Sequence, residues 1–279
     1  MNISFVKMHG AGNDFIVVDD REEQFPLHDR DWMARIANRR TGVGSDGILL
    51  IQPSKQADFR MRFINPDGGE VDMCGNGARC IARHAYTLGI APISMSIETR
   101  AGPLHADIVG EQVRLQMMDP KDWVIDQPLK VRDQTFSYTF LNTGVPHVVL
   151  ETADVSSVDV DDLGRSIRWH AAFQPEGTNV NFVQRTGPGT LTVRTYERGV
   201  EEETLACGTG IVASGLAMVR RHGMTLPVQV RAAGGDVLEV NGDLSLRGGT
   251  QVTLCGPAVT VYQGSLLYRA PLASGKAKE

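Results

Sequence analysis

The chain has 279 residues, 42% of them hydrophobic and 22% charged, the balance of an ordinary globular protein with room for one large domain or two smaller ones. Its formal net charge of −5 at pH 7 is mild and spread along the sequence, so it offers no basic patch for nucleic acid and no polybasic membrane anchor. No apolar run approaches the ~20 residues of a membrane-spanning helix, and a strand pattern begins directly after Met1, so we expect a cytoplasmic, reducing setting.

Strand signals dominate the first half of the chain. Short segments rich in β-branched or alternating apolar residues predict strands at 3–8, 15–19, 47–51, 59–64, 94–99, 104–109 and 113–118. One helix is predicted at 31–39, with Asp29 or Asp31 as its N-cap. Residues 42–47 match the dinucleotide pattern G-x-G-x-x-G, but they follow a helix and open a strand, so we interpret them as a turn and not as a nucleotide site.

A polar, proline-containing break at 119–122 is the candidate domain boundary, and after it the order of elements repeats. The second half predicts a helix around 161–173 and strands at 135–141, 147–150, 180–184, 190–195, 228–232, 237–241, 244–247 and 252–254. We therefore expect an α+β fold of two pseudo-symmetric lobes. Each lobe would be a mostly antiparallel sheet or barrel wrapped around a central helix that begins at a Cys-Gly motif.

The two Cys-Gly motifs are the most informative feature of the sequence. Cys74-Gly75-Asn76-Gly77 precedes a helical pattern at 78–88, and Cys207-Gly208-Thr209-Gly210 precedes one at 211–221. A thiol at a helix N-terminus faces unpaired backbone N–H groups, which favours the thiolate and lowers the pKa, while glycines let an anionic group approach closely. Two such thiols facing each other across a cleft could move a proton between the two faces of one carbon, which is what a cofactor-free racemase or epimerase needs.

Other interpretations of the cysteines stay open at this point. A lone cysteine is more often a small buried residue, and this is our interpretation of Cys80 and Cys255. A regulatory disulfide between Cys74 and Cys207 would make the chain a redox-switch protein. The sequence has no C-x2-C pair for a zinc site and no lysine in a phosphate-binding context for pyridoxal phosphate. We therefore expect neither metal nor cofactor.

Further motifs stand around the two cysteines in a defined order. They are Lys7-Met8-His9-Gly10-Ala11-Gly12-Asn13-Asp14-Phe15, Asn65-Pro66-Asp67-Gly68, Pro146-His147, Thr178-Asn179-Val180-Asn181-Phe182 and Tyr196-Glu197-Arg198-Gly199. Together the motifs resemble the diaminopimelate epimerase family, which interconverts LL- and meso-diaminopimelate without a cofactor on the route to lysine and peptidoglycan precursors. The resemblance runs from about residue 7 to residue 262. It implies a two-lobed fold with the active site between the lobes and a last strand that crosses back to the first lobe.

The polar break at 119–122 places the N-terminal lobe at 1–119 and the C-terminal lobe at 120–259, and the resemblance implies that a strand near 260–269 completes the first lobe. The small, polar residues 270–279 predict a disordered tail. The resemblance also implies residue roles. Cys74 and Cys207 would be the acid and base, with His147 and Glu197 setting their protonation. Substrate contacts would come from Asn13, Asn65, Gly75, Asn76, Asn179, Glu197, Arg198, Gly208 and Thr209.

Arg198 would bind the distal carboxylate, because a guanidinium suits bidentate pairing. The expected partners are a small amino-acid substrate and a second copy of the chain, with Tyr262 at the homodimer interface. Neither nucleic acid nor membrane is expected.

Two positions depart from the commoner family pattern. Gly47 stands where a glutamine often follows Gly-x-Asp, and Val145 stands where an asparagine often precedes Pro-His. Both missing amides would help to hold the substrate. A related cofactor-independent racemase of another amino acid is therefore the alternative interpretation.

Overall fold

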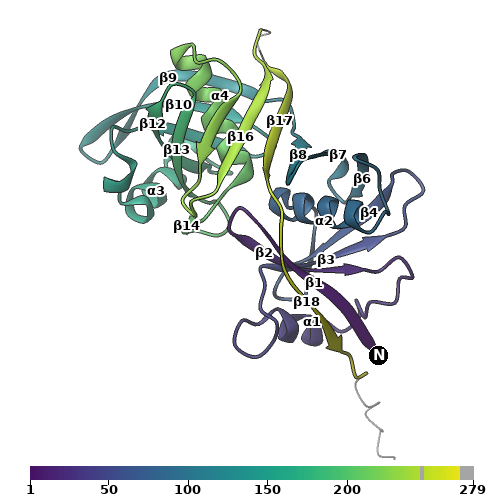
Figure 1. Cartoon of the computed structure of the whole chain (residues 1–279). Helices are drawn as coiled ribbons and strands as arrows, with labels where there is room; N and C mark the ends of the chain where they lie inside the picture. Colours follow the sequence, from purple (N-terminus) through teal and green to yellow (C-terminus); the bar gives the residue numbers. More distant parts are fainter. Residues whose placement is uncertain (246–247, 271–279) are drawn as a thin grey trace, which may run out of the picture.

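The computed structural model describes residues 1–245 and 248–270, which form two lobes joined through strands (Figure 1). The elements of the first repeat are β1 (Asn2–Gly10), β2 (Asn13–Asp19), α1 (Arg30–Ala37), β3 (Gly47–Gln52), β4 (Phe59–Ile64), β5 (Glu70–Val71), α2 (Gly75–Thr87), β6 (Ser94–Thr99), β7 (Gly102–Val109) and β8 (Gln112–Gln116). The connecting strand β9 (Lys121–Val131) follows.

The second repeat presents the same kinds of element in the same order. Its elements are β10 (Gln134–Asn142), β11 (Pro146–Glu151), η1 (Val155–Ser157), α3 (Val160–Arg168), η2 (Ala171–Phe173), β12 (Asn179–Gly187), β13 (Thr190–Tyr196), β14 (Glu203–Thr204), α4 (Gly208–His222), β15 (Val228–Arg231), β16 (Val237–Asp243) and β17 (Thr250–Pro257), and β18 (Val259–Leu267) ends the described chain.

Strand pairing makes the repeat explicit. In the first lobe β1–β2 is antiparallel, β2–β3 parallel, β3–β4 antiparallel and β4–β6 parallel. In the second lobe β10–β11, β11–β12, β12–β13 and β13–β15 follow the same alternation. The structure is therefore a sheet-rich α+β fold built from two copies of one unit, as the sequence predicts.

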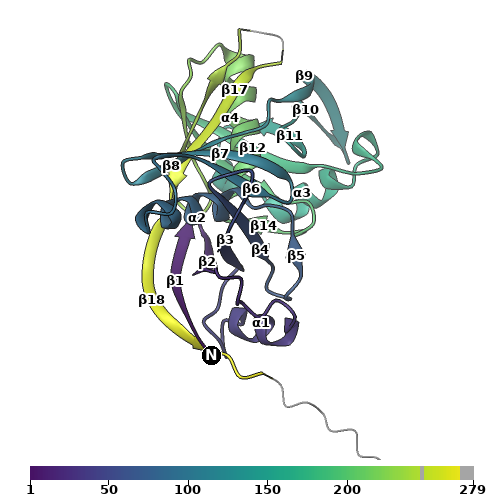
Figure 2. The same cartoon turned by 90° about the vertical axis from the view of Figure 1, so that its right-hand side faces the viewer.

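The two units exchange their last strands. β9 follows β8 of the first unit and pairs with β10 of the second, whereas β18 follows β17 of the second unit and pairs with β1 of the first. β18 runs back along β1 in both views of the molecule (Figures 1 and 2). β8 and β17 also pair antiparallel across the lobes, from Gln112 with Pro257 to Gln116 with Thr253. On this pairing we propose lobes of 1–119 and 120–259, with β18 completing the first.

Each lobe packs its core around the helix that follows a Cys-Gly motif. α2 buries small and aliphatic side chains such as Ala78, Ile81 and Ala85 together with a few polar ones, and α4 buries a longer series from Ile211 to Val219. Small side chains let the surrounding strands approach the helix closely. Cys80 and Cys255 are both buried, as expected of packing residues.

Three local predictions are wrong. α3 ends at Arg168 instead of reaching 173, because the side chain of His170 caps a separate 3-10 turn by accepting from Ala172 N. β9 begins inside the polar break at 119–122 and was missed, since most of its residues are exposed and show no apolar alternation. Leu244 and Ser245 lie outside any strand, because Asp243 accepts a hydrogen bond from Ser245 N in a turn. The rest of that predicted strand, 246–247, and the tail at 271–279 lie outside the described residues.

Gly47 opens β3 directly against β4. A Cβ at this position would lie 2.3 Å from Cε2 of Phe63 and 2.8 Å from the carbonyl oxygen of Ile64. A glutamine therefore fits here only if the Phe63 ring moves. The departure from the commoner family pattern has a packing reason in this chain.

Gly47→Ala is expected to lower the free energy of unfolding by about 1–3 kcal/mol, because the added methyl overpacks the β3–β4 contact. Urea unfolding measures the change. Gly248→Ala is the control, since its Cβ would meet nothing nearer than Pro120 O at 3.6 Å. Equal stability of the two variants would contradict the packing argument.

Candidate active site

The N-termini of α2 and α4 meet between the lobes. Cys74 and Cys207 are their N-cap residues, and neither side chain makes a capping hydrogen bond. Nδ2 of Asn76, in the first turn of α2, lies 3.5 Å from the carbonyl oxygen of Ala206, the residue before Cys207. The structure thus brings the two Cys-Gly motifs together from distant parts of the sequence.

Burial decides the pKa of both thiols. It raises the pKa of Cys74, although the backbone N–H groups of Gly77 and Asn76 act in the opposite direction. It raises the pKa of Cys207 to about 12, and the charges of Glu197 and Cys74 add to the rise. The backbone N–H groups at the helix N-termini lower both pKa values, as the sequence predicts, but the expectation of a lowered net pKa is wrong, because the desolvation of a thiolate outweighs a few backbone donors.

Glu197 lies close enough to influence both thiols. Its negative charge raises the pKa of Cys74 and of Cys207. Burial raises the pKa of Glu197 itself, although its Oε2 accepts a hydrogen bond from Thr204 Oγ1 at 2.9 Å. A carboxylate in this environment is a stronger base than one in water.

His147 is fully buried on β11 and its protonation is set by Asn181. Asn181 Nδ2 donates to Val148 O at 2.9 Å and lies 3.2 Å from His147 Nδ1, while Asn181 Oδ1 accepts from Thr195 Oγ1. Because the amide nitrogen can only donate, Nδ1 is the acceptor and the ring proton sits on Nε2. Nε2 is buried and has no hydrogen-bond partner among the described residues.

Burial, together with the charge of Arg198, lowers the pKa of His147 to about 3. The imidazole is therefore neutral near pH 7 and presents an N–H donor. Sequence reasoning missed Asn181, which also touches the second Cys-Gly motif: a Cβ at Gly210 would lie 2.3 Å from Asn181 Oδ1 and 3.3 Å from Cys207 Sγ. The sequence does carry a signal for Asn181, since residues 179 and 181 lie on the same face of one strand and Asn179 is a predicted site residue.

The predicted substrate contacts fall into two groups. Asn13 and Asn76 are joined directly, with Asn76 Nδ2 donating to Asn13 Oδ1 at 2.5 Å. Asn179 is buried and accepts from the backbone N–H of Arg198 at 2.8 Å, while its Nδ2 donates to Pro146 O. Asn179 therefore fixes the backbone beside His147 and beside Arg198 at once.

The remaining predicted contacts differ in how tightly they are held. The Arg198 guanidinium is partly exposed and lies 3.9 Å from Glu176 Oε2. Asn65 stands in a turn after β4, and its side chain makes no hydrogen bond within the described part of the chain. A Cβ at Gly75 would meet nothing within 4 Å, so there is open space beside the first turn of α2. Thr209 Oγ1 lies 3.6 Å from Cys207 Sγ.

Within 1–245 and 248–270, no three His, Cys, Asp or Glu side chains gather in a way that could hold a metal ion. In the same ranges no helix is long and apolar enough to cross a membrane.

A family model for diaminopimelate epimerase matches the chain twice, over residues 5–124 and 139–258. The chain belongs to the diaminopimelate epimerase family. The diaminopimelate epimerase of Aquifex aeolicus is 41% identical over 280 residues, covering 95% of this chain and 98% of its own. The diaminopimelate epimerase of Chlorobaculum tepidum is 40% identical, and the match covers 93% of this chain and 99% of its own. The chain is accordingly an isomerase of the amino-acid epimerase class, and the resemblance seen in its motifs is confirmed.

Two solved structures share the fold at low sequence identity. A phenazine biosynthesis protein of the PhzF family from Bacillus anthracis superimposes with a TM-score of 0.72 at 18% identity and covers 96% of this chain and 100% of its own. A hydroxyproline epimerase from Agrobacterium vitis superimposes with a TM-score of 0.68 at 16% identity, and the match covers 95% of this chain and 92% of its own. At these identities the likeness concerns the fold alone.

Glu197→Gln is expected to lower the pKa of Cys207, because the substitution removes the negative charge that disfavours the thiolate. The rate of alkylation of Cys207 by iodoacetamide, followed by peptide mass spectrometry across pH, should therefore rise at a lower pH than in the original protein. Glu202→Gln, exposed in the same loop, is the matched control. An unshifted profile in Glu197→Gln would refute the electrostatic link.

Proposed function

We propose that this chain interconverts LL- and meso-diaminopimelate by a two-base mechanism with Cys74 and Cys207. The proposal is supported by the family membership and, above all, by one geometric observation. Two cysteines from two copies of one unit cap helices whose N-termini meet, and the charge of Cys74 raises the pKa of Cys207. Thiols in this relation suit proton removal on one face of a carbon and proton delivery on the other.

In the proposed reaction one sulfur is a thiolate and the other a thiol. The thiolate takes the α-proton, and the electron pair of the broken C–H bond moves into the α-carboxylate. The second thiol gives its proton to the opposite face of the carbon and becomes the thiolate. Backbone N–H groups of Gly75, Asn76, Gly208 and Thr209, at the two helix N-termini, would stabilise the added negative charge.

Because burial raises the pKa of both thiols, the reaction needs a nearby base that forms the thiolate. We propose that Glu197 accepts the proton from a thiol, since burial raises its own pKa and makes its carboxylate a stronger base. We propose that the Nε2–H of His147 donates to the resulting negative charge. This assignment is supported by a neutral imidazole whose Nε2 has no other partner among the described residues.

The two groups of polar side chains suit the two ends of the substrate. We propose that Asn13 and Asn76 contact the reacting amino-acid end, and that Asn65, Asn179 and Arg198 serve the distal end. Arg198 carries a planar cation that suits a second carboxylate, and its backbone is fixed by Asn179. A mechanism that needs two free thiols also requires a reducing compartment, so we propose a cytoplasmic location.

Replacing one thiol should separate the exchange of the α-proton with solvent from the inversion of the α-carbon. Cys74→Ala and Cys207→Ala are expected to lose epimerisation, because one face of the α-carbon then lacks a proton donor. Each variant should still exchange the α-proton of one stereoisomer with retention. NMR of LL- and meso-diaminopimelate incubated in D2O measures both outcomes, and single-carboxylate amino acids complete the substrate panel.

Cys80→Ala and Cys255→Ala are the matched controls, since both thiols are packing residues, and they should keep near-normal turnover. Normal inversion by Cys207→Ala would contradict the two-base mechanism. If the unaltered chain leaves diaminopimelate untouched but exchanges a single-carboxylate amino acid, the alternative racemase replaces the proposed function.

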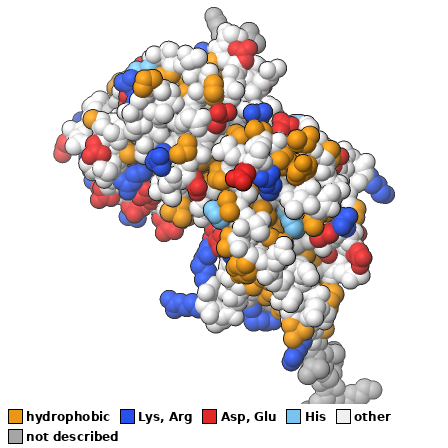
Figure 3. All heavy atoms as spheres, in the orientation of Figure 1, with side chains coloured by type: hydrophobic (Ala, Val, Ile, Leu, Met, Phe, Trp, Pro, Cys, Tyr) orange, Lys and Arg blue, Asp and Glu red, His pale blue; other side chains and the backbone are white. Residues whose placement is uncertain are grey.

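We further propose that the active form is a homodimer with β18 at its interface. Hydrophobic side chains lie along this strand on the face seen in Figure 3. Val259, Val261 and Tyr262 are 43%, 56% and 44% exposed. The Tyr262 ring is held edge-to-face against Phe5, with centroids 6.0 Å apart, so it is rigid enough to anchor a partner.

Tyr262→Ala is expected to weaken the dimer by about 2 kcal/mol or more, the loss typical of a buried aromatic anchor. Sedimentation velocity across a concentration series measures the dissociation constant. Tyr86→Ala, which removes a similarly exposed tyrosine at the end of α2, should leave the constant unchanged. A monomeric original protein, or equal effects of the two variants, would overturn this interface.

A further inference from the structure

We propose that Arg79 and Asp46 are positioning residues for the reaction, because they fix the side-chain orientations of Asn76 and Asn13 from the two ends of one hydrogen-bond chain. The inference deepens the proposed function and rests on it, since both asparagines are substrate contacts there. Neither Arg79 nor Asp46 is among the residues that the sequence motifs suggest for the site.

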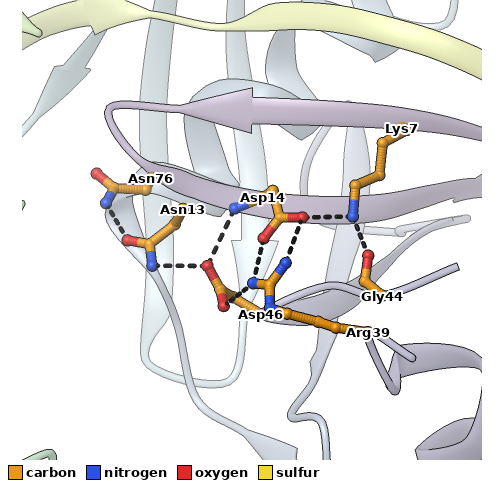
Figure 4. A network of polar contacts seen from close by, with 7 residues as sticks. All are labelled: Lys7, Asn13, Asp14, Arg39, Gly44, Asp46 and Asn76. Atoms are coloured by element: carbon orange, nitrogen blue, oxygen red, sulfur yellow. Dashed lines mark hydrogen bonds and ion pairs between the residues drawn. The ribbon is translucent and has the colours of Figure 1, made fainter. Parts of the chain in front are cut away.

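The chain of hydrogen bonds runs in one direction. Arg79 Nη2 donates to Asn76 Oδ1 at 2.7 Å. Asn76 Nδ2 donates to Asn13 Oδ1 at 2.5 Å, and Asn13 Nδ2 donates to Asp46 Oδ2 at 3.0 Å. Figure 4 shows the last two links and the charged cluster beyond them. Two neutral amides therefore stand between a cation and an anion.

The charged ends determine which way each amide faces. An asparagine side chain has a donor and an acceptor of nearly the same shape, so its two orientations fit one space equally well. A guanidinium has no acceptor, and a carboxylate has no donor. Arg79 thus requires the oxygen of Asn76, and Asp46 requires the nitrogen of Asn13. Each end also holds the far amide through the Asn76–Asn13 bond. With one end lost, the amide beside it is held by that neutral bond alone. With both ends lost the pair can turn over, and an oxygen then faces a substrate group that needs an N–H.

Arg79 is fully buried within α2, where an apolar side chain would normally pack at lower cost. Its Nε donates to Pro257 O at 3.3 Å, at the point where the chain leaves β17 for β18. Its positive charge lowers the pKa of Cys74, in opposition to the effect of burial. A buried cation that bonds both an asparagine and the crossing strand has the contacts of a residue that organises this helix N-terminus.

Asp46 is held by hydrogen bonds from three residues at the other end, although it is more exposed than Arg79. Its Oδ2 also accepts from the backbone N–H of Asp14, and its Oδ1 accepts from Arg39 Nη2 at 2.6 Å. Arg39 bonds Asp14 as well, and Lys7 forms an ion pair with Asp14 (Figure 4). The carboxylate therefore cannot rotate away from Asn13. The turn at 42–47, which imitates a dinucleotide motif in the sequence, supplies this anchor.

The test is a double-mutant cycle with Asp46→Asn and Arg79→Met. Each single variant should lower kcat/KM for diaminopimelate by about 10- to 100-fold, the effect of one lost charge-assisted hydrogen bond. Because each end also holds the far amide through the Asn76–Asn13 bond, the double variant should lose more than the product of the two single losses. Losses that only multiply would overturn the inference, because they would mean two independent effects.

Asp58→Asn is the matched control for Asp46→Asn. Asp58 lies in the same lobe and also accepts from a backbone N–H and a side chain, both of Ser96, but it stands at the end of β4 away from Asn65. It should change kcat/KM by less than about twofold, as expected of a surface substitution. If Arg79→Met does not fold, Arg79→Gln takes its place in the cycle, since a neutral amide offers both a donor and an acceptor and no longer requires the oxygen of Asn76.

A second readout does not depend on turnover. The side-chain amide NMR signals of Asn13 and Asn76 should each form one set in the original protein and should shift or double in Asp46→Asn. Unchanged signals together with normal kcat/KM would refute the positioning role while leaving the proposed function intact. If the original protein does not act on diaminopimelate, the proposed function fails, and the amide signals alone then decide whether the two ends orient the asparagines.

Discussion

Two helix N-termini are held towards each other in this protein, and the rest of the structure depends on that constraint. Each N-terminus is the positive end of a macrodipole with unpaired N–H groups, so two of them in proximity repel. Hydrogen-bonded pairing between strands of the two units holds the two N-termini together despite this repulsion. β18 belongs to the second unit by sequence and to the first by pairing, and β8 pairs with β17 across the lobes. Negative charge would relieve the repulsion, and in the proposed reaction a carboxylate substrate and a thiolate would bring it.

Burial gives the groups around this point their chemical character. Both thiols and Glu197 have raised pKa values and His147 has a lowered one, so each group is biased towards its neutral form. The positive charges that counter this bias are the backbone donors of two helices and the buried Arg79. A charge formed in such a site interacts strongly with its neighbours because little water screens it. The site is therefore suited to moving one proton among closely coupled groups.

The fold alone does not decide the reaction. A PhzF-family protein and a hydroxyproline epimerase share the two-unit architecture at 18% and 16% identity. The chemistry of this chain has to be sought in the side chains around the meeting point, among them Cys74, Cys207, Glu197 and the asparagines. Function resides in such groups and not in the scaffold that presents them.

The sequence by itself determined the elements whose signals are local. Alternating apolar residues predicted most strands, the Cys-Gly motifs predicted α2 and α4, and the ordered motifs were enough for the family. It did not predict β9, whose residues are mostly exposed, or the end of α3, which the side chain of His170 sets. Only the tertiary structure decided the thiol pKa values, because desolvation depends on every atom packed around a group. It also revealed the contacts that Asn181, Asp46 and Arg79 make with His147, Asn13 and Pro257, because these partners lie on other elements of the fold.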